Sequence, residues 1–343
     1  MGAGYVTLEQ VAEHAGVSLA TASRVINGST RQVSERLREK VTASARELGY
    51  LANASAQTLA RNSSSLVGLI VHDISDPYFS SIASGVTRHT EEQDLVLVLG
   101  TTSRSHHRES RLLATLRAHR ARAVVLVGSR ATDEEANKRL AKEIDVFRGQ
   151  GGRVACVSQP GLPADTVSPD NHAGAADLAR HLMAQGHREF AILAGPTDLS
   201  TARERLDGFH SALSSAGLGL AHHNVVHGDF TRDGGYESTR RLMATGNDAT
   251  CLFAVNDVMA TGAMAALRDL GKSVPGDLSV AGFDDIPTLR DLTPALTTVR
   301  LPLEEMGRRA AALALDGEPA QEPRVVTVRG EVVERASTAP PAC

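Results

Sequence analysis

The sequence predicts a small all-α module at the N-terminus, followed by an α/β core built from two lobes with doubly wound parallel sheets. Three observations support this fold class. Apolar residues recur with the spacing of short amphipathic helices through residue 50. From residue 66 onward, short apolar runs alternate with stretches of helical periodicity. The length of 343 residues suits a small module plus a two-lobed core better than one small domain.

The N-terminal module contains clear signals for the start and end of helices. Thr7 and Gln10 have the spacing of a capping box, and Gly16 can adopt the left-handed conformation that ends a helix. Ser18 is a suitable N-cap for a second helix, and Ser34 for a third. Short helices with a tight turn between the first two form a helix-turn-helix, although any small three-helix bundle has the same periodicity.

Composition and charge exclude several classes of protein. Lys and Arg outnumber Asp and Glu within residues 1–62, whereas the whole chain has a net charge of −4, so the module is modestly positive and the remainder negative. The cysteines lack the spacing of a metal site or a disulfide framework, so we expect no metal, no cofactor and a reducing cytoplasm. We expect neither export nor a membrane partner, because no signal peptide precedes the module and no apolar run reaches about 18 residues.

The string V-T-L-E-Q-V-A-E-H-A-G-V-S-L-A-T-A-S-R-V-I-N-G (6–28) resembles the headpiece of the lac repressor family, the LacI/GalR regulators. The pattern continues through V-S-E-R-L-R-E-K-V and E-L-G-Y-L-A-N. The resemblance implies that the second helix enters the major groove of double-stranded operator DNA. It places these residues at base edges: Leu19, Ala20 and Arg24. It places these near phosphates: Thr7, Ser18, Thr21, Ser23 and Asn27.

The chemistry of these side chains agrees with the roles that the resemblance implies. Arg24 can make a bidentate contact to guanine, and Leu19 and Ala20 can contact a thymine methyl group. Hydroxyl groups that bind phosphates position a protein without specifying a sequence. For Thr21 and Ser23, a solvated helix surface is the alternative.

Residues 52–65 are predicted to be a hinge helix and linker between the headpiece, 1–51, and the core, 66–343. Their length and alanine content permit one short helix that is not stable alone. By resemblance, this helix folds on the operator and wedges Leu59 into the minor groove, with Asn53 and Ala56 beside it. Ala52 stands where the family usually has Pro, and a flexible tether is the alternative for the free protein.

Seven apolar runs of the core are predicted to be strands: 66–71, 95–99, 123–127, 153–157, 190–193, 251–255 and 279–283. Such strands, separated by helices, form parallel sheets that are covered on both faces. A division near residue 161 predicts two lobes, with ligands bound in the cleft at the carboxyl ends of the strands. We expect an N-lobe of 66–160 plus a segment near 300–322, and a C-lobe of 161–295 plus the C-terminal strand.

The core resembles the same family in strings such as H-D-I-S-D-P-Y-F, A-V-N-D-V-M-A-T-G and V-A-G-F-D-D-I-P, and it is similar to periplasmic sugar-binding proteins. The resemblance implies an effector site at Asp76, Tyr78, Phe79, Thr201, Arg205, Phe230, Asn256 and Asp284. Stacking rings with carboxylates and amides suit a carbohydrate or nucleoside. Leu199 stands where purine-sensing members have Arg, which disfavours a purine, and Leu301 replaces a polar residue common in sugar sensors.

Several side chains have a structural alternative to a functional role. Asp257 and Asp285 are expected to brace strand-end turns rather than contact ligand. Arg205 belongs to an Arg-Glu-Arg run, 203–205, whose alternative is a surface ion pair. The His pairs at 106–107 and 222–223 lack partners at metal-ligand spacing and are expected in solvated loops.

The predicted function is that of a nucleoid-associated, sequence-specific transcriptional regulator, most often a repressor in this family. It is expected to bind a pseudo-palindromic operator as a homodimer, because the chain ends without the leucine heptads of the family's tetramer-forming tail. A P-loop, G-x-S-x-G and a dinucleotide-binding motif are absent from the sequence, so no enzyme is expected. A solute-binding transport protein and a sugar-processing enzyme are the disfavoured alternatives. Both induction and corepression by the effector stay open.

Overall fold

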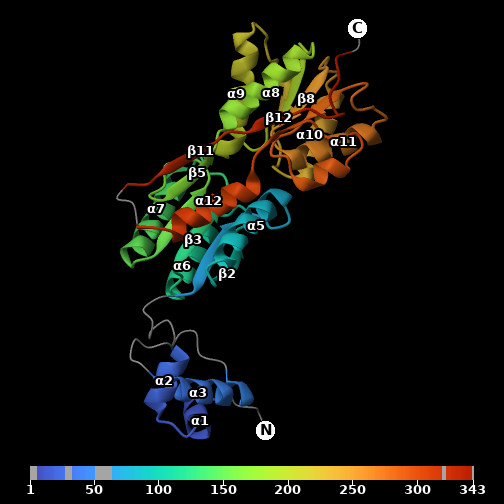
Figure 1. Ribbon diagram of the computed structural model, residues 1–343. Coiled ribbons are helices and arrows are strands. Elements are labelled where there is room, and N and C mark those ends of the chain that lie inside the picture. The colour runs from blue at the N-terminus through green and yellow to red at the C-terminus, as the bar shows by residue number, and fades with distance from the viewer. Residues whose placement is uncertain (1–5, 28–32, 51–63, 319–321, 342–343) are drawn as a thin grey trace. The chain divides into compact units, whose positions relative to one another are not determined.

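The computed structural model describes residues 6–27, 33–50, 64–318 and 322–341. The chain divides into two compact units, Met1–Ser65 and Leu66–Cys343 (Figure 1). Within the described ranges, no helix has the length and apolar character that crossing a membrane requires.

Within the described residues of the N-terminal unit lie the helices α1 (Leu8–His14), α2 (Leu19–Asn27) and α3 (Glu35–Glu47). The predicted capping box is confirmed, because Thr7 N donates to Gln10 Oε1 at 2.9 Å and Gln10 N donates to Thr7 Oγ1 at 3.3 Å. Gly16 has the expected left-handed backbone, with φ of +59°. Ser34 precedes α3, but its side chain makes no capping hydrogen bond. A small core joins the helices: Val11, Ala12, Ala15, Ala22, Val41 and Ala45.

The N-lobe of the core is a six-stranded parallel sheet with the order β11-β5-β4-β3-β1-β2. Its strands are β1 (Leu66–Val71), β2 (Val96–Thr101), β3 (Ala123–Val127), β4 (Arg153–Val157), β5 (Asp165–Pro169) and β11 (Val325–Val328). Its helices are α5 (Pro77–Glu91), α6 (His106–Ala118), α7 (Glu134–Gly149) and α12 (Leu303–Leu315).

Alternating side chains of the N-lobe strands pack against different helices. Val125 and Val127 belong to the core that includes α5 and α12. Val124 and Leu126 belong to the core that includes α6 and α7. Since successive residues of a strand point to opposite faces, helices cover the central strands on both faces, as the near-continuous apolar runs predict.

The C-lobe is a four-stranded parallel sheet with the order β7-β6-β8-β9. Its strands are β6 (Phe190–Leu193), β7 (Val225–Val226), β8 (Cys251–Ala254) and β9 (Ser279–Ala281). Its helices are α8 (Asn171–Ala184), α9 (Ser200–Ser215), α10 (Arg232–Ala244) and α11 (Asp257–Asp269). Figure 1 shows α8 beside α9, and α10 beside α11.

The chain crosses between the lobes after β5, at β10 (Thr298–Arg300) and at β12 (Glu331–Val333). β10 and β12 pair antiparallel. β5 and β11 extend the N-lobe sheet, so this lobe reaches past residue 160 and includes a strand beyond 322. Neither strand has a long apolar run, which is why the sequence pattern does not reveal them.

Two sequence expectations need correction. β2 is an edge strand that is not covered on both faces, since Val96 is 57%, Val98 41% and Leu99 43% exposed. The His pairs lie in helices rather than loops, because His106 and His107 begin α6 and His222 begins the 3-10 helix η1 (His222–Asn224). A second 3-10 helix, η2, covers Pro287–Asp291.

Candidate functional site

A cavity lies between the two lobes. It is lined by residues that follow the carboxyl ends of strands in both sheets, as doubly wound folds predict. The structure brings all of the expected effector-site positions to this cavity: Asp76, Tyr78, Phe79, Thr201, Arg205, Phe230, Asn256 and Asp284. Four further residues line it: His72, Arg104, Ser129 and Leu199.

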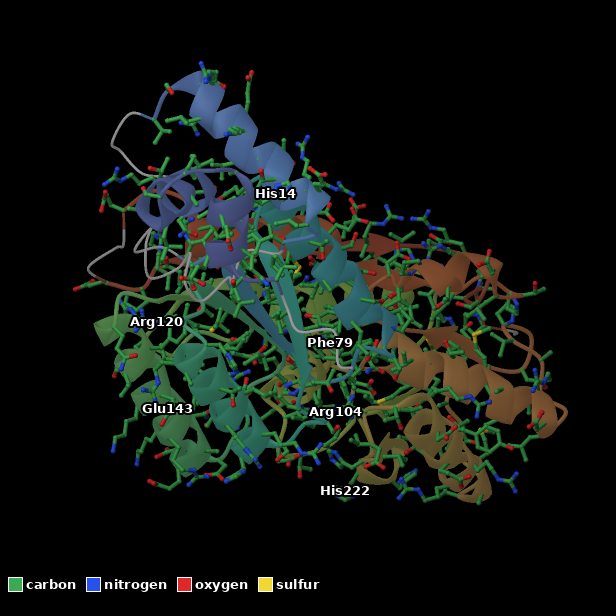
Figure 2. All side chains as sticks on the ribbon, turned by 90° about the horizontal axis from the view of Figure 1, so that it is seen from below. His14, Phe79, Arg104, Arg120, Glu143 and His222 are labelled. Atoms are coloured by element: carbon green, nitrogen blue, oxygen red, sulfur yellow. The ribbon has the colours of Figure 1, made fainter. Side chains whose placement is uncertain are left out.

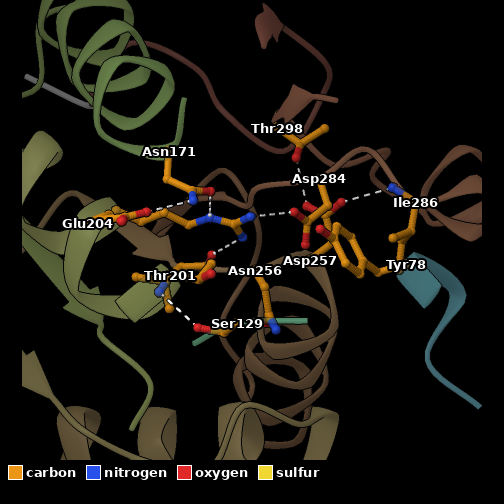
Figure 3. Close-up of polar contacts among 12 residues, drawn as sticks. Tyr78, Ser129, Asn171, Thr201, Glu204, Asn256, Asp257, Asp284, Ile286 and Thr298 are labelled. Atoms are coloured by element: carbon orange, nitrogen blue, oxygen red, sulfur yellow. Dashed lines mark hydrogen bonds and ion pairs between the residues drawn. The ribbon is translucent and has the colours of Figure 1, made fainter. Parts of the chain in front are cut away.

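Arg205 on α9 is 1% exposed and organises the C-lobe side of the cavity. Its guanidinium Cζ lies 3.9 Å from the ring centre of Phe283. Nε donates to Asn171 Oδ1 at 2.9 Å and Nη1 donates to Val255 O at 2.7 Å. Nη2 donates to Asp284 Oδ1 at 2.7 Å, and both side chains of this ion pair are buried (Figure 3). The polar contacts therefore hold the guanidinium in one orientation.

The surface ion pair considered for residues 203–205 is wrong. Glu204 instead accepts a hydrogen bond from Asn171 Nδ2 at 2.8 Å (Figure 3) and one from Gln159 Nε2 at 3.1 Å. Because Asn171 also accepts from Arg205, the acidic residue positions the amide that orients the guanidinium.

Asp284 has a strained backbone and a shifted pKa. Its φ is +122° and that of Asp285 is +57°, in a region that residues with a side chain rarely adopt. Asp284 N donates to Val299 O at 2.8 Å, and Leu301 N donates to Asp284 O at 3.2 Å, so β10 holds this backbone in place. Burial raises the pKa of the Asp284 carboxyl to about 6, while the charge of Arg205 opposes the shift.

The bracing roles expected for the two neighbouring carboxylates are confirmed. Asp285 accepts from Arg300 Nε at 2.7 Å and from Arg335 Nη2 at 2.6 Å. Asp257 accepts from Thr298 Oγ1 at 2.7 Å and from Ile286 N at 3.0 Å (Figure 3), and burial raises its pKa to about 8. Both carboxylates thus tie the loop after β9 to other segments of the core.

The N-lobe side of the cavity combines a carboxylate with aromatic rings. Asp76 caps α5 by accepting from Tyr78 N at 3.0 Å, and burial raises its pKa. The rings of Tyr78 and Phe79 meet edge to face with centroids 5.1 Å apart. Phe79 in turn meets the His72 ring at 5.7 Å. These contacts form a wall on which a flat ligand face can stack.

Polar contacts join the lobes beside the cavity. Thr201 N donates to Ser129 Oγ at 3.0 Å (Figure 3), and Gln159 Nε2 donates to Thr201 Oγ1 at 2.8 Å. Ala131 and Leu199 form an isolated antiparallel bridge. Asn256 caps α11 through Oδ1, which accepts from Met259 N at 2.9 Å, so its amide nitrogen is the atom left to donate to a ligand.

His72, Arg104 and Ser129 were missed by the sequence reasoning, although each follows an N-lobe strand. They come directly or within three residues after β1, β2 and β3. The rule that ligands bind at carboxyl ends of parallel strands, applied to each strand in turn, is the signal that finds them.

We expect acid to destabilise the fold through His72. The ring is buried, and its Nδ1 lies 3.0 Å from Thr102 Oγ1. Burial is the main cause that lowers the His72 pKa from 6.5 to about 4. An unfolded histidine therefore gains a proton at a higher pH than the folded one, so stability present above pH 6.5 is lost as the pH falls towards 4. The full effect is about 3 kcal/mol.

Urea unfolding of the wild-type chain and of His72→Gln at pH 7.5 and 5 measures this contribution to the free energy of unfolding. The stability difference between wild type and variant should shrink at pH 5, because only the wild type has a histidine at position 72 to be protonated. An equal difference at both pH values would contradict it.

The helix α2 presents a distinct exposed surface in the N-terminal unit. Ala22 is fully buried, whereas Leu19, Ala20 and Arg24 are exposed on the side that does not pack in the core. Such a face is free to enter a groove of DNA.

The polar positions of this unit make local hydrogen bonds. Ser18 Oγ accepts from Thr21 N at 3.2 Å and lies 2.9 Å from Thr21 Oγ1. Asn27 Nδ2 donates to Ser23 Oγ at 3.1 Å. The hinge positions Asn53, Ala56 and Leu59 lie outside the described residues.

Comparison with known families covers both units of the chain. Residues 7–53 match the bacterial regulatory proteins of the lacI family. Residues 179–338 match the periplasmic binding protein-like domain.

Individual relatives match over nearly the whole chain. The HTH-type transcriptional regulator GalR of Escherichia coli (strain K12) is 34% identical over 311 residues, which cover 90% of this chain and 88% of GalR. A solved complex of the transcriptional regulator CelR with cellobiose has a TM-score of 0.71 at 33% identity and covers 97% of this chain and 99% of CelR. The lac repressor dimer bound to operator and the anti-inducer ONPF has a TM-score of 0.82 at 27% identity, covering 98% of this chain and 100% of that one. These matches confirm the predicted fold class.

Proposed function

The chain belongs to the lacI family of bacterial regulatory proteins and is a DNA-binding transcriptional regulator rather than an enzyme, and from this premise we propose that a neutral carbohydrate controls it. The carbohydrate binds in the cavity between the lobes and changes the affinity for a pseudo-palindromic operator. A regulator of this kind acts in the bacterial cytoplasm, at the nucleoid.

The equal number of carboxylates and guanidinium groups that line the cavity is the main support for this proposal. Among the described lining residues, two carboxylates, Asp76 and Asp284, face two guanidinium groups, Arg104 and Arg205. A ligand with a net charge leaves one of these groups without compensation. A sugar hydroxyl, by contrast, donates to a carboxylate and accepts from a guanidinium at the same time. Cellobiose in the CelR complex supports the same class of ligand.

Aromatic and apolar residues complete the match to a carbohydrate. Tyr78, Phe79 and Phe230 line the cavity and can stack on the apolar face of a sugar ring. Leu199 is 7% exposed and adds an apolar contact. With Thr201 and Asn256, these residues and the charged groups form the proposed effector site.

For operator binding, we propose that α2 reads bases through Leu19, Ala20 and Arg24. Small polar residues contact phosphates: Thr7, Ser18, Thr21, Ser23 and Asn27. The hinge acts in the minor groove through Asn53, Ala56 and Leu59. The exposure of the three α2 side chains supports the base-reading role.

A thermal-shift panel with cellobiose, ribose, gluconate and adenosine tests the effector class. A neutral sugar at 100 times its Kd should stabilise the protein by about 2.7 kcal/mol. The same sugar should change operator affinity in a fluorescence anisotropy titration. Stabilisation by gluconate or adenosine alone would contradict a neutral carbohydrate.

We also propose that the regulator is a homodimer that pairs through β2 and its surroundings. The exposed apolar side chains of this edge strand, Val96 and Val98 on one face and Leu99 on the other, border an edge that a second copy can cover. The lac repressor, which shares the fold, binds operator as a dimer. A dimer presents two headpieces to the two halves of a palindrome.

Leu99→Asp is therefore expected to convert the dimer to a monomer and to weaken operator binding by at least about tenfold, since a buried unpaired charge disrupts an apolar interface. Sedimentation velocity and operator titration measure the two effects. Val146→Asp, at an exposed apolar position on α7, is the matched control. A Leu99→Asp protein that stays dimeric would place the interface elsewhere.

A further inference from the structure

Arg104 reaches from one lobe to the other across the cavity. It lies in the loop between β2 and α6 of the N-lobe, whereas Phe230 lies between β7 and α10 of the C-lobe. Arg104 Nη2 donates to Phe230 O at 2.7 Å, and its Cζ lies 5.6 Å from the centre of the Phe230 ring. Arg104, Phe230 and Phe79 all line the cavity, and Figure 2 labels Arg104 and Phe79 on the ribbon. One side chain therefore spans the site.

The loop that carries Arg104 is fixed in an unusual conformation. Ser103 and Arg104 have φ values of +50° and +61°, which side-chain-bearing residues adopt only when their surroundings impose it. Thr102 N donates to Val71 O at 3.0 Å, and Ser103 N donates to His72 O at 2.8 Å. These bonds tie the loop to the strand beside it and aim Arg104 at the C-lobe.

Arg104 also differs from Arg205 in the donors that it has left. Arg205 already donates to Asn171, Val255 and Asp284. A guanidinium has five N–H donors, and within the described part of the chain Arg104 gives one to Phe230 and forms no ion pair. Burial lowers the pKa of Arg104, while the negative charges of Asp76, Asp73 and Asp229 oppose this shift. Arg104 is thus a cation at the cavity whose remaining N–H groups can donate to a ligand.

We propose that Arg104 is the clasp that couples effector binding to lobe closure: it holds the lobes together through Phe230 and donates its remaining N–H groups to an oxygen of the effector. The second half of this role rests on the proposed function, and the first does not. A lysine at position 104 would keep the positive charge that donates to the Phe230 carbonyl. It would lack the planar guanidinium that can donate to two oxygens at once.

Hydrogen exchange on the ligand-free full chain tests the clasp. The amides of Ser200 and Thr132 donate across the lobes, to Arg130 O and Asp198 O, both at 3.0 Å, so their exchange reports lobe opening. Arg104→Ala should speed the exchange of these amides about tenfold, because a hydrogen bond from a charged donor is lost. Amides inside β3 should not change.

Two further variants separate a clasp from a local effect. Arg108→Ala is the control, since Arg108 is exposed, is not among the residues that line the cavity and donates to Ser103 Oγ of the same loop at 3.4 Å. It should exchange like the wild type. Arg104→Lys should restore much of the protection.

Isothermal titration with cellobiose and ribose tests the contact to the effector. Arg104→Ala and Arg104→Lys should both bind the wild-type sugar at least about tenfold more weakly, whereas Arg108→Ala should bind it normally. Equal sugar affinity in Arg104→Ala would overturn the contact. Unchanged exchange in Arg104→Ala would overturn the clasp, whichever sugar binds. Faster exchange without any sugar binding to the wild type would support the clasp and contradict the proposed effector class.

Discussion

Replacing Asp284 by Asn is expected to abolish the response to effector while leaving operator binding in place. Asn retains the shape of the side chain and tolerates a positive φ, which Asp284 has at +122°. It removes the negative charge opposite Arg205, whose guanidinium lies 2.7 Å from Asp284 Oδ1 and is buried. Loss of one partner of a buried ion pair costs about 3–5 kcal/mol. We expect effector affinity to fall about a hundredfold, since the site loses its geometry as well as an acceptor.

Operator binding followed by fluorescence anisotropy, with and without the stabilising sugar, measures this effect. Asp291→Asn is the matched control, because Asp291 is exposed at the end of η2. The control should respond to sugar like the wild type. An Asp284→Asn protein that still responds at the wild-type sugar concentration would show that the effector binds elsewhere.

Arg24→Ala should weaken operator binding by about 1–3 kcal/mol and relax the preference for one base pair in each half-site. Arg24 is exposed on α2 beside Leu19 and Ala20, and it is the one of these three side chains that carries hydrogen-bond donors. Effector affinity should not change, because the cavity lies in the other unit of the chain.

An operator selected in vitro and its single-base variants provide the measurement. Arg38→Ala is the control for loss of surface charge. Arg38 is exposed on α3, and its Nε lies 3.8 Å from Glu35 Oε2. If Arg24→Ala weakened binding to all variants by the same factor, Arg24 would contact phosphate and not a base.

The central strands of the core could be predicted because they are buried. β1, β3 and β4 lie inside the N-lobe sheet, and their apolar runs begin and end where the strands do. The strands that were missed lie at edges or crossovers, where partial exposure permits polar residues. β5 contains Asp and Ser, and β12 begins with a glutamate. The pattern of apolar residues indicates which side chains are buried and not which backbone groups form hydrogen bonds, so it does not predict such strands.

The candidate site divides in a similar way. Resemblance to one family pointed to residues that the structure brings to a single cavity. The pairing of Arg205 with Asp284 joins positions 79 residues apart and depends on tertiary structure, so no local pattern contains it. Arg104 follows β2 within three residues, so the strand-end rule could have found its position. The positive φ that aims its side chain at the C-lobe is not signalled by its residue type.

We propose that a sugar in the cavity and DNA at the headpiece bias the same conformational equilibrium. Linkage then requires the factor by which saturating sugar changes operator affinity to equal the factor by which saturating operator changes sugar affinity. Titrating the stabilising sugar into free and operator-bound protein measures the second factor. We expect operator to change sugar affinity by a factor of about 5–150, equal to the factor by which sugar changes operator affinity. A sugar that binds free and operator-bound protein with equal affinity would contradict this account.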